Sequence, residues 1–440
     1  MARIHQGPVA RALVVENPHV SLDARLEKLG MHVHRKSGAA PDEDELIALL
    51  QETRAQVIFK RSRVPVTRRV VESCPDLLAV QLCCIGDDSV DKVACADHGV
   101  LVFNDPVSNG RSVVELVVGH LIGLSRRLYE TNASCREGAW EKNNTDRYEI
   151  QGKVLGVLGL GNIGRAVART CESLGMEIRF FDTREVSCEL GREMGWTLAS
   201  SVEDLFRGSD AVTVHVSARS VNGTSNASLL ESGVLAQLGA DRPATSPRLF
   251  LNLSRGFLHS AEELLGAVAD GRVKRAAVDV YPSEPRGKGT VWANPYAAEP
   301  RVVVTPHIGA STQEAQPRIA TRVSQTFGGF SQRGNLRDCV FRPRMTLGFD
   351  ELPSGTVALL LVAHATTRGT KRAIDETIYD AGASNLSSAH RDFDDLGVAY
   401  DLAALDRALT DTQLEDLVAA ATRITGDANA IRSIRQVVVR

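Results

Sequence analysis

An arginine, a glutamate and a histidine each follow an apolar, strand-like segment in the second half of the chain. These are Arg255, Glu284 and His307. In open α/β sheets, ligands bind beyond the carboxyl ends of the strands. We therefore expect the three side chains to face one crevice, although each follows a different strand.

The three side-chain types suit hydride transfer to or from a 2-hydroxy acid. The guanidinium of Arg255 is a forked, planar donor that can hold a carboxylate next to the reacting carbon. His307 can exchange a proton with the hydroxyl or carbonyl oxygen, and a hydrogen bond from its other ring nitrogen to Glu284 favours the imidazolium and fixes the ring. A nicotinamide would supply or accept the hydride.

A glycine-rich turn upstream predicts the dinucleotide. Residues 154–164 read VLGVLGLGNIG, an apolar strand that runs into G-x-G-x-x-G, and a helix is expected over 165–174. Gly159 permits the tight turn, Gly161 lets the backbone approach a pyrophosphate, and Gly164 lets the helix pack on the strand. The pyrophosphate is expected at the positive end of that helix. Alone, an arginine or histidine is more often a surface residue; the ordered set after this turn favours catalysis.

An acidic residue favours NAD over NADP. Asp182 stands 18 residues after Gly164, at the end of the expected strand 178–181. A carboxylate there accepts hydrogen bonds from the ribose hydroxyls and repels a 2′-phosphate. Arg184 is the residue that would favour NADP instead.

Composition excludes several classes of protein. The 440 residues carry 51 Lys and Arg against 54 Asp and Glu, a net charge of −3, which argues against a nucleic-acid binder. No apolar run reaches the roughly 18 residues of a membrane helix, and the N-terminus has no apolar signal segment, so a cytoplasmic protein without membrane contact is expected. The eight cysteines form no C-x-x-C, so neither a disulfide framework nor a metal site is predicted.

Two alternating strand–helix series must position these residues. The first predicts strands at 13–16, 31–34, 56–59, 77–82 and 100–103, with helices at 22–29, 42–50, 68–73 and 90–97. The second begins at Lys153 and persists to about Thr305. Such alternation predicts two doubly wound parallel sheets. Between them, Ser112 and Glu115 predict a capping box that opens a buried helix running to about Leu128, suited to a subunit contact.

The last 85 or so residues predict a third domain. They read as strand 356–364, helix 371–380, strand 387–393, strand 397–401, helix 411–424 and strand 433–439. This β-α-β-β-α-β order is the ferredoxin-like arrangement.

With these motifs the chain resembles the D-isomer-specific 2-hydroxyacid dehydrogenases, and among them the bacterial phosphoglycerate dehydrogenases that carry a C-terminal ACT domain. The resemblance rests on residues 159–164, 252–256, 279–285 and 305–316. It implies a substrate-binding domain at 1–108 with a return segment at 305–340, an NAD-binding domain at 109–304, a linker at 341–354, and an ACT-like regulatory domain at 355–440.

The resemblance also carries residue roles. The family's catalytic arginine, glutamate and histidine fall on Arg255, Glu284 and His307. Together with two strand-end residues that we expect to line the cofactor, His215 and Val216, the predicted cofactor contacts are Gly159, Gly161, Asn162, Ile163, Gly164, Asp182, Leu253, Ser254, Asp279, Ile308, Gly309 and Ala310.

The substrate is expected to have an anionic tail. Arg61, Ser62 and Arg63 follow an apolar strand and suit a phosphate or carboxylate, although charge clusters are often only solvated loops. By resemblance, Asn109 and Lys142 are further substrate-side residues, and the lysine reaches a neighbouring subunit of a homodimer or homotetramer. The predicted reaction is oxidation of 3-phosphoglycerate to 3-phosphohydroxypyruvate, the first step of L-serine biosynthesis.

Three departures from the family pattern leave other substrates open. Ser217 stands where proline is usual, residues 240–247 look inserted, and residues 86–91 are unusually acidic. The alternatives are another anionic-tailed hydroxy acid, such as 2-hydroxyglutarate, a phosphonate or a phosphorylated acid, and a non-catalytic NAD sensor on the same fold.

The last domain is expected to bind an amino-acid effector. His364 and Asn385 occupy positions that resemble serine-binding residues of feedback-inhibited relatives, and Thr366 replaces an asparagine there. L-serine is therefore a candidate effector.

Overall fold

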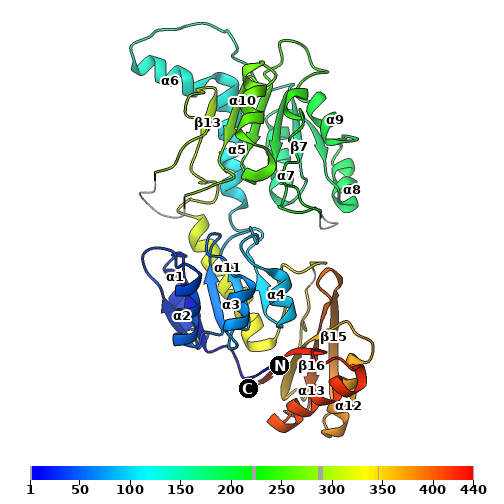
Figure 1. Cartoon of the computed structure of the whole chain (residues 1–440). Helices are drawn as coiled ribbons and strands as arrows, with labels where there is room; N and C mark the ends of the chain where they lie inside the picture. The colour runs from blue at the N-terminus through cyan, green and yellow to red at the C-terminus, as the bar shows by residue number, and fades with distance from the viewer. Residues whose placement is uncertain (1, 221–223, 286–290, 345, 440) are drawn as a thin grey trace. The chain divides into compact units, whose positions relative to one another are not determined.

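The computed structural model describes residues 2–220, 224–285, 291–344 and 346–439. It divides into two compact units, residues 1–106 with 316–440 and residues 107–315 (Figure 1). The predicted α/β class with parallel sheets is confirmed. The units divide at 106/107 and 315/316, where the sequence predicted 108/109 and 304/305.

The unit formed by 107–315 is built on a seven-stranded parallel sheet. Its order is β13-β12-β11-β10-β7-β8-β9. The strands are β7 (Val154–Leu158), β8 (Glu177–Phe181), β9 (Thr197–Leu198), β10 (Ala211–Val214), β11 (Leu249–Asn252), β12 (Arg275–Val278) and β13 (Val302–Val304). The helices are α5 (Gly110–Arg126), α6 (Leu128–Arg136), α7 (Asn162–Ser173), α8 (Glu185–Glu193), α9 (Val202–Arg207) and α10 (Ala261–Ala269), with short 3₁₀ turns at Leu235–Gln237 and Gly256–Leu258.

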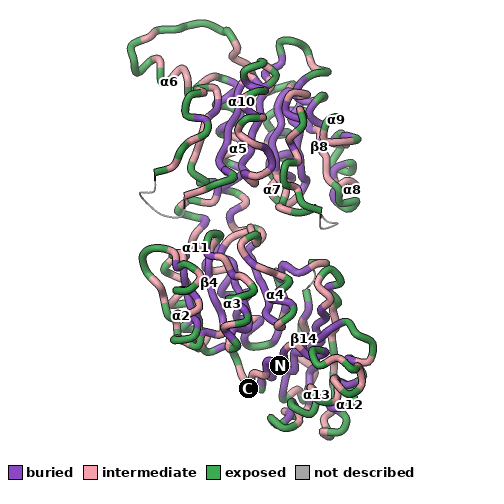
Figure 2. The backbone as a smooth tube through the Cα atoms, viewed as in Figure 1, coloured by how far each residue is buried: buried purple, intermediate pink, exposed green. Residues whose placement is uncertain are grey.

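This sheet is covered on both faces, which its sequence requires. Strands β7, β10, β11 and β12 are buried at every position, as expected for apolar strands of a parallel sheet (Figure 2). From β7, the next strands along the chain (β8 and β9) are added on one side of the sheet, and the later strands (β10 to β13) are added on the other side. The carboxyl ends of β7 and β10 therefore flank a topological switch point, where doubly wound sheets bind ligands.

The predicted capping box at the start of α5 is wrong. The helix begins at Gly110, so Ser112 lies inside its first turn, and Asn109 precedes it without a side-chain cap. Ser112 instead hydrogen-bonds Thr312 at 2.9 Å, and Glu115 pairs with Arg111. The helix is largely buried, as its apolar residues predicted.

The other unit begins with a five-stranded parallel sheet of order β3-β2-β4-β5-β6. Its strands are β2 (Arg11–Val14), β3 (His32–Arg35), β4 (Val57–Lys60), β5 (Ala79–Leu82) and β6 (Leu101–Phe103). Its helices are α1 (Ser21–Glu27), α2 (Glu43–Thr53), α3 (Arg68–Ser73), α4 (Lys92–Asp97) and α11 (Ala315–Arg333). Phe327 of α11 packs edge-on against Phe59 and Phe103, which fixes the returning helix on this sheet.

A second sheet in this unit has the order β1-β17-β14-β16-β15. Its elements are β1 (Arg3–Gln6), β14 (Ala358–Ala365), α12 (Thr370–Asp380), β15 (Asn385–Phe393), a 3₁₀ turn (Asp394–Leu396), β16 (Val398–Leu405), α13 (Asp411–Thr425) and β17 (Ile431–Val438). The last four strands have the ferredoxin-like order that their sequence predicted. The sequence predicted no strand before residue 13 and assigned residues 1–108 to the first domain, but residues 3–6 form β1, which pairs in parallel with β17.

One hydrophobic core joins these two sheets. Leu361, Tyr400 and Leu402 belong to the same buried cluster as the strands of the first sheet. At this contact the hydroxyl of Ser433 donates to the carbonyl of Gly99 at 3.0 Å, and the buried guanidinium of Arg435 stacks on Phe330 and donates to its carbonyl. Among the described residues, no helix is both long and apolar enough to cross a bilayer.

Candidate active site

The glycine turn between β7 and α7 has the shape that a dinucleotide needs. Gly159 has a φ of +92°, and a Cβ there would lie 2.7 Å from the carbonyl oxygen of His215. A Cβ on Gly164 would lie 2.0 Å from the carbonyl oxygen of Gly159, so only glycine lets α7 pack this closely. At Gly161 the nearest atom to a Cβ is the Arg184 guanidinium at 3.8 Å. The open space lies before an α7 N-terminus without a side-chain cap, which fits a pyrophosphate.

Asp182 lies directly after β8, beside the glycine turn. Its carboxylate accepts the N–H of Leu160 at 2.7 Å and the N–H of Arg184 at 2.8 Å. The guanidinium of Arg184 also contacts it, 3.2 Å from Oδ2. The Asp182 carboxylate is therefore fixed beside the glycine turn, and its charge is partly balanced by Arg184, the residue that could receive a 2′-phosphate. Recognition of the ribose hydroxyls by Asp182 stays a prediction.

Arg255 is placed by a turn that Asn252 organises. The side-chain carbonyl of the buried Asn252 accepts the N–H of Ser254 at 3.1 Å, and its amide donates to the carbonyl of Arg255 at 3.0 Å. Gly256 follows because a Cβ there would lie 2.0 Å from the backbone of Tyr281. The turn after β11 is therefore locked against the segment after β12. Sequence reasoning included residues 252–256 in a motif but missed this role of Asn252.

Glu284 and His307 are in direct contact. His307 Nδ1 lies 2.8 Å from Glu284 Oε2 and 3.0 Å from Oε1. Glu284 is itself held by the N–H of Tyr281 at 3.2 Å. The imidazole is half-exposed, so Nε2 is left to face a substrate while Nδ1 faces the carboxylate.

Asp279 holds the loop that carries His307. Its carboxylate accepts the Thr305 hydroxyl at 2.6 Å and the N–H groups of Ile308 and Gly309, each at 2.9 Å. His307 has a φ of +54°, a strained conformation for a non-glycine residue. Three hydrogen bonds to a buried carboxylate keep the loop in this shape. The predicted contact of Asp279 with the nicotinamide stays a prediction.

The remaining cofactor positions also lie at the carboxyl edge of the sheet. Asn162 and Ile163 occupy the first turn of α7, and Leu253 and Ser254 follow β11. His215 and Val216 follow β10, and burial lowers the pKa of His215 to about 3, so this ring is neutral. Its Nε2 lies 3.0 Å from the Thr213 hydroxyl. The other members of the set lie after β13, at Ile308, Gly309 and Ala310.

The predicted substrate residues fall in both units. Arg61, Ser62 and Arg63 follow β4, next to the switch point of their own sheet. The N–H of Arg63 donates to Glu16 at 2.7 Å, a contact that sequence reasoning missed. In the other unit, Asn109 is buried before α5 and Lys142 is exposed after α6.

Lys60, directly before this loop, is fully buried. Its ammonium donates to the carbonyl of Arg61 at 2.8 Å and to Ser89 at 2.7 Å, and Glu16 lies 3.9 Å away. Burial lowers its pKa. The lysine therefore braces the Arg61 backbone and does not extend into solvent.

The three predicted effector residues have different surroundings. Thr366 and Asn385 are exposed, whereas His364 is buried and bonded to Asp401. Nothing in the sequence indicated Asp401, which lies far from His364 along the chain.

Comparison with known proteins agrees with the dinucleotide-binding motif and the site residues described above. Residues 118–309 match the description "D-isomer specific 2-hydroxyacid dehydrogenase, NAD binding domain". The D-3-phosphoglycerate dehydrogenase of Haemophilus influenzae is 34% identical over 342 residues, which span 78% of this chain and 78% of that protein. The Escherichia coli K12 protein of the same name is 34% identical over 76% of this chain and 78% of its own length.

Solved structures show the same fold. A glyoxylate reductase from Paecilomyes thermophila has a TM-score of 0.64 and 22% identity, covering 76% of this chain and 98% of that one. The TT0316 protein from Thermus thermophilus has a TM-score of 0.61 and 25% identity, covering 72% of this chain and 95% of that one.

Proposed function

The chain belongs to the D-isomer specific 2-hydroxyacid dehydrogenases, which makes it an NAD-dependent oxidoreductase, and on that premise we propose that it oxidises 3-phosphoglycerate to 3-phosphohydroxypyruvate. The observation that carries the proposal is the hydrogen-bonded Glu284–His307 pair at the strand edge that also bears Arg255 and the glycine turn. The curated relatives named above support the choice of substrate.

The proposed roles follow from the geometry of each side chain. Arg255 binds the substrate carboxylate and orients the carbon that loses its hydrogen. Nε2 of His307 takes the hydroxyl proton, and Glu284 stabilises the imidazolium that forms and keeps the ring in place. Asp279 keeps His307 in its strained loop. NAD, when bound, accepts the hydride.

We assign the phosphate end of the substrate to the loop after β4. Arg61 and Arg63 offer forked donors at the switch point of their sheet, and the buried contacts of Lys60 and Glu16 hold that loop in shape. Asn109 and Lys142 complete the proposed substrate set, the lysine by acting on a neighbouring subunit of a homodimer or homotetramer.

The test is a substrate panel with purified protein and NAD. It contains 3-phosphoglycerate, 2-hydroxyglutarate, D-lactate and a 2-hydroxy phosphonate, read as kcat/KM from NADH absorbance. We expect 3-phosphoglycerate to lead, and Arg61→Gln to reduce its kcat/KM about tenfold or more while D-lactate is unaffected. Faster turnover of another acid would reject this substrate and keep the reaction class. If the protein binds NAD but turns over none of these acids, the result would favour the alternative function, a non-catalytic NAD sensor on the same fold.

The regulatory part of the proposal is an amino-acid effector that binds the C-terminal domain through His364, Thr366 and Asn385. The panel is therefore run with and without L-serine and other amino acids. Inhibition by L-serine that Asn385→Ala removes would support this assignment. An unchanged rate with every amino acid would reject it.

A further inference from the structure

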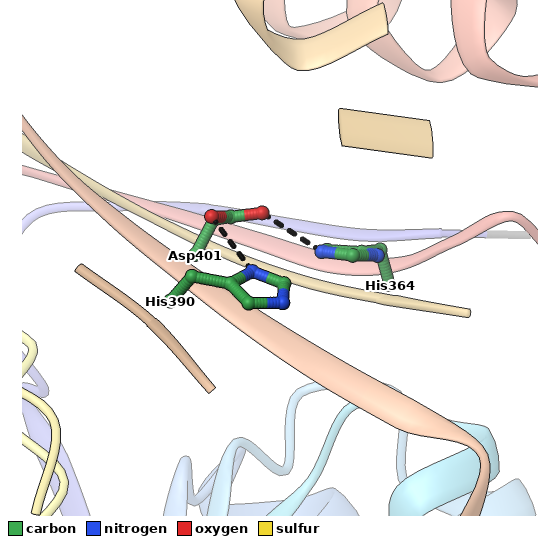
Figure 3. Close-up of side chains that lie close together, drawn as sticks. All are labelled: His364, His390 and Asp401. Carbon is green, nitrogen blue, oxygen red and sulfur yellow. Dashed lines mark hydrogen bonds and ion pairs between the residues drawn. The ribbon is translucent and has the colours of Figure 1, made fainter. Parts of the chain in front are cut away.

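Three strands of the C-terminal sheet bring two histidines and an aspartate together, in a different compact unit from Arg255, Glu284 and His307. His390 of β15 lies directly opposite Asp401 of β16. His364 of β14 lies two residues beyond Val362, which pairs with Asp401, so all three side chains project from one face of the sheet. Figure 3 shows both imidazoles turned toward the Asp401 carboxylate.

Both ring nitrogens of His364 face hydrogen-bond acceptors. Nδ1 lies 2.7 Å from the carbonyl oxygen of Ala365, and Nε2 lies 2.8 Å from Asp401 Oδ2. A neutral imidazole has one N–H donor and one lone pair. With the N–H on Nδ1, the Nε2 lone pair points at a carboxylate, which is repulsive unless a cation lies between them.

His390 is in the same situation. Its Nδ1 lies 3.0 Å from Asp401 Oδ1, and its Nε2 lies 3.1 Å from Asp392 Oδ1. Asp392 can accept the N–H of Nε2, which leaves the Nδ1 lone pair facing Asp401. In this arrangement, a second proton or a metal ion would satisfy both nitrogens of each ring.

We propose that His364 Nε2, His390 Nδ1 and Asp401 bind one divalent transition-metal ion of the zinc class. Two imidazoles and one carboxylate are ligands that Zn²⁺ accepts, with one position left for water. Histidine ligands of metals donate their other N–H to a carboxylate or a backbone carbonyl. Asp392 and the carbonyl of Ala365 already occupy these outer positions.

The donor atoms are close enough for one ion after a small adjustment. They all lie within 4.8 Å of one another, and two ligands about 2.1 Å from one ion are at most about 4.2 Å apart. The side chains of His364 and Asp401 are each only 4% exposed, whereas the His390 side chain is 32% exposed and is therefore the least constrained of the three.

The Asp401 carboxylate is the centre of the cluster. His364 Nε2 lies 2.8 Å from its Oδ2, and His390 Nδ1 lies 3.0 Å from its Oδ1. A metal ion bound to these three groups would let each ring donate its remaining N–H, to Asp392 or to the carbonyl of Ala365.

Lys371 is the competitor of the metal. Its ammonium lies 2.7 Å from Asp401 Oδ1, and its side chain is 48% exposed, so it can move into solvent when the ion binds. Removal of this positive charge should therefore tighten metal binding, while it would weaken a purely structural ion-pair cluster.

The experiment titrates full-length protein, freed of metal with a chelator, with Co²⁺ and then displaces it with Zn²⁺. We expect one Co²⁺ per chain with the intense visible absorption of a site of low coordination number. His390→Gln should abolish this signal, Asp392→Asn should weaken binding about tenfold or more, and Lys371→Gln should strengthen it. Calorimetry with Zn²⁺ gives the affinities.

Two variants act as controls. His307→Gln removes a histidine–carboxylate pair of the other unit, and His34→Gln removes an exposed histidine, so both should keep the full signal. The proposal fails if fewer than about half the chains bind Co²⁺, if His390→Gln binds like the parent, or if Lys371→Gln binds more weakly. Circular dichroism of each variant verifies that it is folded.

Discussion

At the scale of single residues, we expect Asp182 to decide between the two nicotinamide dinucleotides. Its carboxylate is held by backbone N–H groups on one side and by Arg184 on the other. Asp182→Ala should weaken NAD binding and leave Arg184 available to a 2′-phosphate, so the ratio of kcat/KM for NAD over that for NADP should fall about tenfold or more. Steady-state kinetics with both cofactors measures this ratio. An unchanged ratio would remove Asp182 from the ribose site.

The Glu284–His307 pair gives a second prediction at this scale. Glu284→Gln keeps the size of the side chain but removes the charge that stabilises the imidazolium, so kcat should fall about 10²-fold or more while NAD affinity stays the same. Stopped-flow turnover and fluorescence titration with NADH separate the two quantities. His307→Gln should lose at least as much, and a smaller loss would contradict its assignment as the proton acceptor.

How far the sequence predicts such residues depends on whether their signal is local. The glycine turn and the segments around Arg255, Glu284 and His307 are short motifs, so the sequence alone could single them out as candidates. Glu16, which braces the Arg61–Arg63 loop, and Asp401, which unites two histidines, carry no local signal. Their importance comes from strand pairing that the sequence does not display.

At the scale of elements, Gly164 shows how helix α7 depends on close packing. Gly164→Ala would force a methyl group to within 2.0 Å of the Gly159 carbonyl oxygen, so we expect destabilisation by a few kcal/mol and loss of NAD binding. Gly266 is the matched control, since it lies in α10 with nothing within 4 Å of a Cβ. Gly266→Ala should stabilise the protein by about 0.5–1 kcal/mol. Chemical denaturation compares the two, and equal effects would contradict the packing argument.

Helix α5 shows where element prediction fails. The spacing of Ser112 and Glu115 satisfies the capping pattern, but the helix starts three residues earlier than that pattern predicts, at Gly110, with Asn109 at the N-cap position. Tertiary contact decided the outcome, because Ser112 hydrogen-bonds Thr312, about 200 residues away. A capping motif can be recognised in the sequence. The distant residue that forms a hydrogen bond with its hydroxyl instead, here Thr312, cannot be recognised there.

At the scale of the whole molecule, His5 links stability to pH. It lies on β1, and its Nε2 is buried without a hydrogen-bond partner among the described residues. Burial first, and the charges of Arg3 and Arg435 next, lower its pKa to about 4, while Asp76 opposes this. The unfolded chain, with a histidine pKa near 6.5, binds the proton more readily.

Stability should therefore be constant above about pH 6.5 and fall by up to about 1.4 kcal/mol per pH unit from His5 as the pH drops toward 4. His5→Gln should reduce this slope, and His32→Gln, an exposed histidine on β3, should not. Urea midpoints at pH 7, 6 and 5 measure the effect. Parallel curves for the parent and His5→Gln would contradict it.

The order of strands and helices in the three sheets was readable from the sequence, whereas the place of β1 was not. Alternating apolar segments predicted three regions of strands and helices in the correct order along the chain, because successive strands and helices are joined by short connections. Strand β1 is only four residues long, and it pairs with β17 more than 400 residues later. No periodic pattern within a strand indicates a partner at that distance.

The pairing of the first strand with the last also constrains biosynthesis. Domains generally fold from the N-terminus while the ribosome is still adding residues. Here residues 3–6 are made more than 400 residues before residues 433–436, to which they are hydrogen-bonded. A polypeptide that stops before β17 therefore leaves β1 with unpaired backbone groups at an exposed strand edge, which is a hazard for aggregation.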